Sequence, residues 1–510
     1  MRRFSIVLRM LTVALMLLVT LCSSLGVSQA AEATLVDGQV IVKLNPLSGA
    51  TIDAINATYG TTTIKPIAGV VATYLLQAPA GETVDALLAR MVGDTRLLYA
   101  EPNFLSNAPE GIGRPRWAWG GPSATPQSSQ YALNLLNLPA AHAITRGAGV
   151  VVAVLDTGFQ LDHLQLSSRL TTARYDFVDN DAIPDNILDT DGDNLADYMS
   201  GHGTHVAGII AQAAPDAQLM LLRVLDTNGV GNSVWVAEAV QYAAVNGADV
   251  INLSLGAPVK SSLIEDAIYE ANREYDVVVV AAAGNDNANP PTFPAGINNS
   301  VIAVSAVGAN RKKTDFANFG SWVDIAAPGD SIYSAFPLNG HAWWSGTSMA
   351  APWVAGQSAL LLSKCPELDP SKVYDKIAAN VTPLAGGLGA GLPDVAKSLE
   401  APCDKDSVDG EDPPDGPPGG DDEGEWQGEI EEFVYGTIDS MPTGTEGEWR
   451  IGGVSYLVNS ATLLNRTEGE LAVGKGVLVN SYADSGGKQI AVVIQGLAVS
   501  YTVYLPMVNG

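Results

Sequence analysis

The chain has 510 residues, which is enough for about three domains at a common size of roughly 150 residues each. Hydrophobic residues make up 47% of it, and this excludes a wholly disordered protein. The formal net charge of −28 disfavours nucleic-acid binding, which needs a basic face, and three cysteines exclude a disulfide-dense scaffold.

Residues 1–30 are predicted to be a signal peptide. Arginines precede an apolar run at 10–22, and the small residues Ser28 and Ala30 stand before the expected cleavage site. A membrane anchor is the weaker alternative because a spanning helix needs about 20 apolar residues. The mature chain is therefore expected to be secreted. It keeps Cys365 and Cys403, either as a disulfide or as two free thiols.

Residues 32–105 are predicted to form a small α+β domain of the split βαβ type. Its expected elements are a strand at 39–44, a helix at 51–59, two short strands within 64–76, a helix at 83–92 and a strand at 96–100. A Pro/Gly/Ser-rich stretch at 108–129 follows. We therefore assign residues 106–130 to a linker.

Residues 131–400 alternate between strand and helix patterns, which predicts an α/β domain with a mostly parallel, twisted sheet flanked by helices. Residues 403–432 are acidic and rich in Pro and Gly, and they are predicted to be an extended linker. Short Val/Ile/Tyr-rich runs between Gly-rich turns predict a small β domain at 433–510, without any recognisable catalytic group.

Two segments of the α/β region place a carboxylate and two imidazoles near predicted element ends. Asp156 ends an apolar run that predicts a strand buried on both faces. It is either a turn residue or a buried acid that needs a partner, since burying an unpaired charge is costly. His202 and His205 lie three residues apart on one face of a predicted helix. One of them can serve as a base, and the spacing does not decide which.

Two further segments supply an amide and a hydroxyl. Asn285 follows a second apolar strand, either as a residue of a left-handed turn or as a donor to developing negative charge. Ser348 stands in a Ser-Gly-Thr-Ser-Met sequence at the start of a helix predicted for 347–362. It is either a helix cap or a nucleophile, because the free N–H groups of a helix end can hold an oxyanion.

In their order along the chain, these motifs resemble the subtilase (subtilisin-like) family of serine peptidases over residues 131–399. The resemblance implies a triad of Asp156, His202 and Ser348, and it selects His202 over His205. It implies that Asn285 is the oxyanion donor. The substrate-binding residues that it implies are Ser254, Leu255, Gly256, Ala283, Gly284 and Thr292.

The family's chemistry is peptide-bond hydrolysis through an acyl-enzyme intermediate, with no metal or organic cofactor. Residues 32–105 resemble its inhibitory propeptide, so we expect a self-processing zymogen whose mature N-terminus lies between 103 and 130. Expected partners are protein and peptide substrates and the chain's own propeptide. Nucleic acid and a membrane span in the mature chain are not expected. The enzyme would act outside the cell, free or attached to the cell surface.

The family's tight calcium site is expected to be absent, because the loop that holds it in longer relatives is missing before the strand predicted at 218–225. A separate acidic loop carries Asp189, Asp191, Asp193 and Asp197 at spacings like those of calcium loops. This loop is a candidate structural calcium site, and a solvated acidic loop is the alternative.

Two other function classes are weaker. A secreted binding protein built on an inactive peptidase scaffold would lack at least one of the required groups, and all are present. A serine esterase would show a Gly-x-Ser-x-Gly motif and the chain order Ser, Asp, His, and the sequence has neither.

Overall fold

The computed structural model describes residues 34–110, 118–185 and 197–403, together with six strands between 434 and 496. The chain divides into two compact units, Met1–Val408 and Asp409–Gly510. The predicted signal peptide and acidic linker lie outside the described residues. None of the described helices is long and apolar enough to cross a bilayer.

The first domain of the larger unit has the predicted order of elements. They are β1 (Leu35–Leu44), α2 (Ile52–Tyr59), β2 (Thr62–Pro66), β3 (Thr73–Gln77), α3 (Val84–Met91) and β4 (Leu97–Asn107), with a 3-10 turn η1 (Pro46–Ser48). The strands form an antiparallel sheet in the order β2-β3-β1-β4. Thr51 and Thr83 cap the two helices through their hydroxyl groups, which accept backbone N–H bonds.

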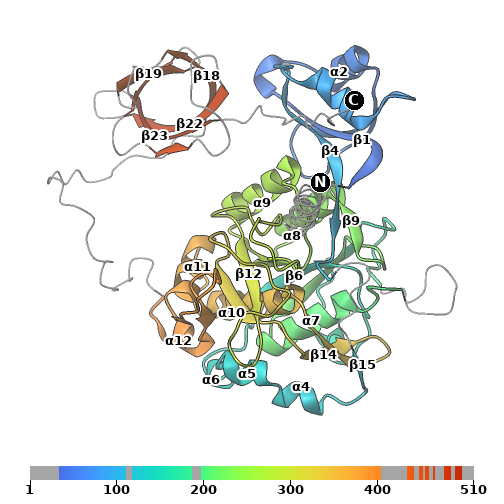
Figure 1. Ribbon diagram of the computed structural model, residues 1–510, viewed down its shortest axis with the longest axis vertical. Helices are drawn as coiled ribbons and strands as arrows, with labels where there is room; N and C mark the ends of the chain where they lie inside the picture. Colours follow the sequence, from blue (N-terminus) through green and yellow to red (C-terminus); the bar gives the residue numbers. More distant parts are fainter. Residues whose placement is uncertain are drawn as a thin grey trace, which may run out of the picture. The chain divides into compact units, whose positions relative to one another are not determined.

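Strand β4 is longer than the strand predicted at 96–100. Its second half leaves the small domain and pairs with β9 (Val230–Asn232), with Leu105 opposite Asn232 and Asn107 opposite Val230. Figure 1 shows β4 running from the blue domain to lie beside β9. The extra length depends on backbone partners supplied by a distant segment, and a local sequence pattern does not report these.

The second domain is built on a sheet of seven parallel strands, in the order β13-β12-β11-β10-β6-β8-β7. The strands are β6 (Val151–Asp156), β7 (Tyr175–Asp176), β8 (Gln218–Arg223), β10 (Val250–Leu253), β11 (Val278–Ala282), β12 (Ile302–Val307) and β13 (Ile325–Pro328). Every residue of β10 to β13 is buried, as expected for strands covered on both faces. The predicted α/β fold class is confirmed.

Long helices cover this sheet. Helices α7 (His202–Ala213) and α10 (Thr347–Lys364) pack against each other, as do α8 (Ser233–Val245) and α9 (Ser262–Tyr275). The smaller helices are α5 (Tyr131–Leu135), α6 (Leu138–Ala141), α11 (Pro370–Ala378), α12 (Val395–Glu400) and the 3-10 turn η2 (Ser167–Arg169). Strands β16 (Val381–Thr382) and β17 (Leu392–Pro393) pair with each other.

The predicted linker at 106–130 is only partly a linker. Strand β5 (Ala118–Gly121) pairs with β15 (Gly340–Trp344), which in turn pairs with β14 (Ile332–Phe336). Helix α4 (Thr125–Ser129) follows, and then the buried Gln130 exchanges two hydrogen bonds with the backbone of Tyr333. The second half of the segment thus belongs to the larger domain, because its backbone groups find partners on the β14–β15 hairpin.

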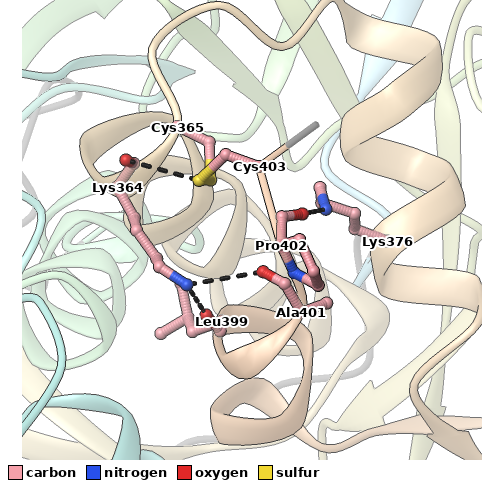
Figure 2. Close-up of a disulfide and its surroundings, with 7 residues drawn as sticks. All are labelled: Lys364, Cys365, Lys376, Leu399, Ala401, Pro402 and Cys403. Carbon is pink, nitrogen blue, oxygen red and sulfur yellow. Dashed lines mark hydrogen bonds between the residues drawn. A yellow bond between two sulfur atoms is a disulfide. The ribbon is translucent and has the colours of Figure 1, made fainter. Parts of the chain in front are cut away.

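Cys365 and Cys403 form a disulfide that joins the end of α10 to the segment after α12 (Figure 2). Two lysines donate to backbone carbonyls beside it: Lys364 to Leu399 and Ala401, and Lys376 to Pro402. Of the two alternatives left open by the sequence, the structure has the bridge. It fastens the end of the domain at the point where the predicted acidic linker begins.

The described strands of the second unit are β18 (Val434–Ser440), β19 (Gly447–Ile451), β20 (Val454–Val458), β21 (Leu463–Asn465), β22 (Gly476–Ala483) and β23 (Gln489–Gly496). They pair in the order β20-β19-β18-β22-β23-β21, and a further pairing of β20 with β23 closes a ring, which Figure 1 shows. The boundaries that the sequence suggests for this domain and its linker stay predictions.

Removal of the disulfide should lower the thermal stability of the larger unit. The bridge spans 38 residues, and in the chain-entropy account a loop of that length stabilises by roughly 4 kcal/mol. We expect the double substitution Cys365→Ser and Cys403→Ser to lower Tm by roughly 5–10 °C, measured by calorimetry in a Ser348→Ala background. Reductant should shift the parent protein similarly and leave the double variant unchanged. An equal Tm for both proteins would contradict the stabilising role.

Candidate active site

The three residues of the predicted triad come from three elements and meet at one edge of the sheet. Asp156 is the last residue of β6, His202 the first of α7 and Ser348 the second of α10, and all three are fully buried. The Asp156 Oδ1 lies 2.6 Å from the His202 Nδ1. This contact is slightly shorter than the roughly 2.7–2.9 Å that is usual for a charge-assisted N–H···O bond. The same oxygen accepts the backbone N–H of Thr157.

A glycine allows α7 to begin at His202. Gly201 has a φ of 89°, a left-handed conformation that residues with a side chain rarely adopt. A Cβ at this position would also lie only 2.7 Å from Phe336 and Pro337. The ring of Trp344 then packs edge-on against His202, with centroids 5.2 Å apart. The imidazole is thus held by packing on one side and by Asp156 on the other.

The second histidine of the motif is in a different environment. The Nε2 of His205 lies 3.0 Å from the carbonyl oxygen of Ala342 and 3.2 Å from that of Ile332. Both partners are acceptors, so this nitrogen carries the hydrogen. Burial lowers the pKa of His205 to about 3, so it is neutral and joins α7 to β14 and β15. The two histidines therefore differ in their contacts: His202 is paired with carboxylates, and His205 is bonded to backbone carbonyls. Their spacing in the sequence does not reveal this difference.

Asn285 follows β11 and faces the start of α10. Its Oδ1 accepts from the backbone N–H of Thr347 at 2.9 Å and from the hydroxyl of Thr347 at 3.0 Å. The Thr347 hydroxyl in turn accepts the backbone N–H of Gly284. These bonds fix which end of the amide is the oxygen. The Nδ2 donor is consequently directed toward the space in front of Ser348.

A carboxylate that the sequence analysis missed occupies that space. The Oε2 of Glu110 accepts the Ser348 hydroxyl at 2.9 Å and lies 3.1 Å from the His202 Nε2. Its Oε1 accepts the Asn285 Nδ2 at 3.2 Å. Glu110 is 2% exposed. Its only signal in the sequence is that it is the one acid in a Pro/Gly/Ser-rich stretch, which indicates no chemistry.

The two carboxylates determine the charge of His202. Burial alone would lower its pKa, but Asp156 on one ring nitrogen and Glu110 on the other raise the pKa to about 10. The contact with Glu110 is an ion pair without the alignment of a hydrogen bond. At neutral pH the ring is therefore an imidazolium between two acids, and in this state it cannot accept a further proton.

The segment before Glu110 forms an added strand between two other segments of the larger domain. Asn107 exchanges two backbone hydrogen bonds of 2.8 Å with Gly256, and the N–H of Ala108 donates to the carbonyl of Gly229. An extended peptide held by main-chain bonds on both sides is a common mode of peptide recognition. The predicted substrate residue Gly256 is thus the backbone partner of this strand.

The other predicted substrate residues lie around the same centre. The Ser254 hydroxyl donates to the backbone carbonyl of Ser348, and the backbone carbonyl of Ser254 lies 3.4 Å from the Ser348 Oγ. The Thr292 hydroxyl donates to the carbonyl of Ala283 at 2.7 Å. Leu255 is fully buried. The side chains of Ser254 and Thr292 therefore bond to the protein itself.

The small domain docks at the N-terminal ends of α8 and α9. The buried Glu101 accepts from the Ser261 hydroxyl and from the N–H groups of Ser262 and Leu263 at the start of α9. Asn103 accepts the N–H of Val234 in the first turn of α8. A negative charge is favourable at a helix N-terminus, so these contacts stabilise the docked domain.

The candidate calcium loop is described only at its end. Asp189, Asp191 and Asp193 lie outside the described residues, and Asp197 accepts a hydrogen bond from the Thr227 hydroxyl. Within the part of the chain that the structure describes, no group of three or more His, Cys, Asp or Glu side chains is arranged to hold a metal ion. Calcium binding stays a prediction.

A buried Asp–His contact with a serine beside it, at the carboxyl edge of a parallel sheet and in the chain order Asp, His, Ser, defines a serine peptidase of the subtilisin-like class. The comparisons with known proteins agree. Residues 147–396 match the subtilase family, and residues 24–103 match the fervidolysin N-terminal prodomain.

Thermitase from Thermoactinomyces vulgaris is 42% identical over 248 residues, covering 46% of this chain and 83% of the relative. A thermophilic serine proteinase from Bacillus sp. (strain AK1) is 39% identical over 293 residues, covering 55% of this chain and 67% of the relative. The chain belongs to the subtilase family. The predicted family, fold class and peptidase activity are confirmed.

The crystal structure of fervidolysin from Fervidobacterium pennivorans, described as a keratinolytic enzyme related to subtilisin, aligns with a TM-score of 0.60. The alignment covers 74% of this chain and 62% of that one, at 23% identity. At this identity the likeness shows the fold alone. Neither family match reaches the C-terminal β unit.

Proposed function

We propose that the protein is a secreted serine endopeptidase in which Asp156, His202 and Ser348 act as the catalytic triad. Ser348 attacks the peptide carbonyl, His202 takes its proton, and Asp156 holds the imidazole in the required tautomer. The observation that carries this proposal is the 2.6 Å contact between Asp156 and His202, with Ser348 beside them on Glu110. Secretion rests on the signal-peptide pattern of residues 1–30.

Asn285 would supply the side-chain donor for the tetrahedral oxyanion, together with the backbone N–H of Ser348. Its support is the bond from its Nδ2 to a carboxylate oxygen, a group that resembles an oxyanion in charge. The proposed chemistry requires no metal or organic cofactor. A structural calcium ion at the acidic loop would leave this mechanism unchanged.

The N-terminal domain would act as an intramolecular inhibitor that the enzyme removes by cutting its own chain. Two observations support this proposal. The second half of β4 pairs with β9 and, at Asn107, with Gly256, a predicted substrate-binding residue, and β5 is already part of the β14–β15 sheet. We therefore propose that the self-cleavage falls after β4 and before β5. Protein and peptide substrates would then bind where β4 now lies.

Loss of the nucleophile tests this function. Ser348→Ala should abolish hydrolysis of protein substrates and leave the precursor uncut, because no acyl-enzyme can form. Gel electrophoresis and N-terminal sequencing of the purified variant would measure this, with the parent protein as control. Maturation of the purified variant in the absence of other peptidases would contradict self-processing.

Loss of the amide donor should act on the chemical step. Asn285→Ala should lower kcat by about a hundredfold or more with little change in KM, since the donor acts on charge that develops in the transition state. Steady-state kinetics on a peptide substrate would measure it. Asn289→Ala, an exposed position in the same loop, is the matched control. A change confined to KM would assign Asn285 to substrate binding.

The methyl group of Thr292 should limit the pocket for the residue before the cut bond. It lies 3.1 Å from the place of a Cβ on Gly284, another of the predicted substrate-binding residues. Leu and Met should therefore be preferred over Phe and Tyr, with differences of about tenfold. Thr292→Gly should raise the relative kcat/KM for Phe and Tyr peptides.

Thr292→Ser is the control for this variant, because it removes the methyl group and keeps the hydroxyl that bonds to Ala283. It should shift the preference in the same direction as Thr292→Gly. A parent enzyme that already prefers Phe and Tyr over Leu would contradict the proposed pocket.

A further inference from the structure

We propose that Glu110 is a built-in inhibitor whose side-chain carboxylate occupies the reacting centre in place of a substrate carbonyl and keeps the precursor inactive until it is withdrawn. This inference rests on the proposed function, since it assumes that Ser348, His202 and Asn285 are the reacting groups. It adds one specific residue and one chemical group, a buried carboxylate, to the proposed inhibition by the N-terminal domain.

Glu110 engages each proposed reacting group. The Ser348 hydroxyl donates its hydrogen to Oε2 at 2.9 Å, so that hydrogen is directed to Glu110. The His202 Nε2 is in an ion pair with the same oxygen at 3.1 Å. The Asn285 Nδ2 donates to the other carboxylate oxygen, Oε1, at 3.2 Å. The nucleophile, the base and the oxyanion donor are therefore all engaged by one side chain.

The Glu110 carboxylate fits at this position because its neighbour Gly346 has no side chain. A Cβ on Gly346 would lie 1.9 Å from the Glu110 Oε1 and 3.3 Å from the Asn285 Nδ2. Burying a carboxylate is unfavourable unless it is paired and hydrogen-bonded, and here it meets a cation and two donors. The pocket thus suits a carboxylate in shape and in charge.

The chain before Glu110 is fixed well enough to deliver it. Asn107 is bonded to Gly256 on one side, and Ala108 to Gly229 on the other. Pro109 follows, and its ring restricts the backbone directly before Glu110. Further upstream, Glu101 holds the strand to the start of α9. Docking of the small domain therefore places the Glu110 side chain in the centre.

The charge state of His202 makes the inhibition dependent on pH. Among the described residues, the charged or titratable groups that face the ring are Asp156, Glu110 and the neutral His205. With both acids present, the pKa of His202 is raised to about 10, so its proton is bound below that pH and is lost as the pH rises through it. Alkaline pH should therefore weaken the ion pair with Glu110. Without Glu110, the ring should lose its proton at lower pH.

The first test measures that titration in the uncut full-length chain. A Ser348→Ala background prevents self-cleavage, and ¹⁵N-histidine NMR follows His202. We expect the midpoint of the parent to fall by at least about one pH unit on Glu110→Gln, because one of two paired charges is lost. Glu82→Gln is the control, since it makes the same change in the same domain at a pair with Arg90. An unchanged midpoint in Glu110→Gln would overturn the proposal.

The second test measures access to Ser348 in the full-length active chain. A small fluorophosphonate labels the nucleophile, and gel electrophoresis separates the precursor band from the mature band. We expect Glu110→Gln and Glu110→Ala to raise the labelling rate of the precursor band at least about tenfold and to leave that of the mature band unchanged. Equal precursor rates in parent and variants would overturn the proposal.

The two tests separate this inference from the proposed function. If the mature band of the parent is not labelled, Ser348 is not the nucleophile and the proposed function fails. The NMR titration does not depend on activity, so it still supports or overturns the Glu110 contact. Glu110→Ala covers the case in which a glutamine amide keeps part of the hydrogen bonding.

Discussion

The buried contact between Asp156 and His202 is the interaction on which the site depends. A carboxylate at the end of a strand covered on both faces is unfavourable unless a partner meets it, and α7 begins where its first residue can do so. Gly201, which precedes the helix, and Trp344, which packs against the ring, then restrict the position of the His202 imidazole. The start of α10 then places Ser348 near this imidazole, so that both side chains contact Glu110.

The same need for partners explains how the N-terminal domain is held. Helices α8 and α9 begin at the surface that the small domain covers, and Glu101 and Asn103 accept N–H groups that the helices cannot bond internally. Strand β4 then continues past its own sheet because β9 pairs with its second half. The contacts at the two helix starts and the pairing with β9 are thus both made by one strand.

The sequence predicted what depends on local patterns and on motif order. Buried strands ending at Asp156 and before Asn285, and a helix starting near Ser348, follow from apolar runs and small residues. It did not predict the length of β4, the pairing of β5 or the position of Glu110, because each depends on partners more than a hundred residues away. A single acid in a Pro/Gly-rich stretch carries no local sign that it faces a serine.

The disulfide at the end of the larger unit has a consequence when one copy of the peptidase can cut another. The acidic residues of the predicted linker all follow Cys403, so a cut after any of them leaves α11 and α12 enclosed between the two half-cystines. The new C-terminal end cannot unfold past Cys403 into the core, because the disulfide holds it. A neighbouring copy that trims the chain there would detach the β unit and leave the catalytic body intact.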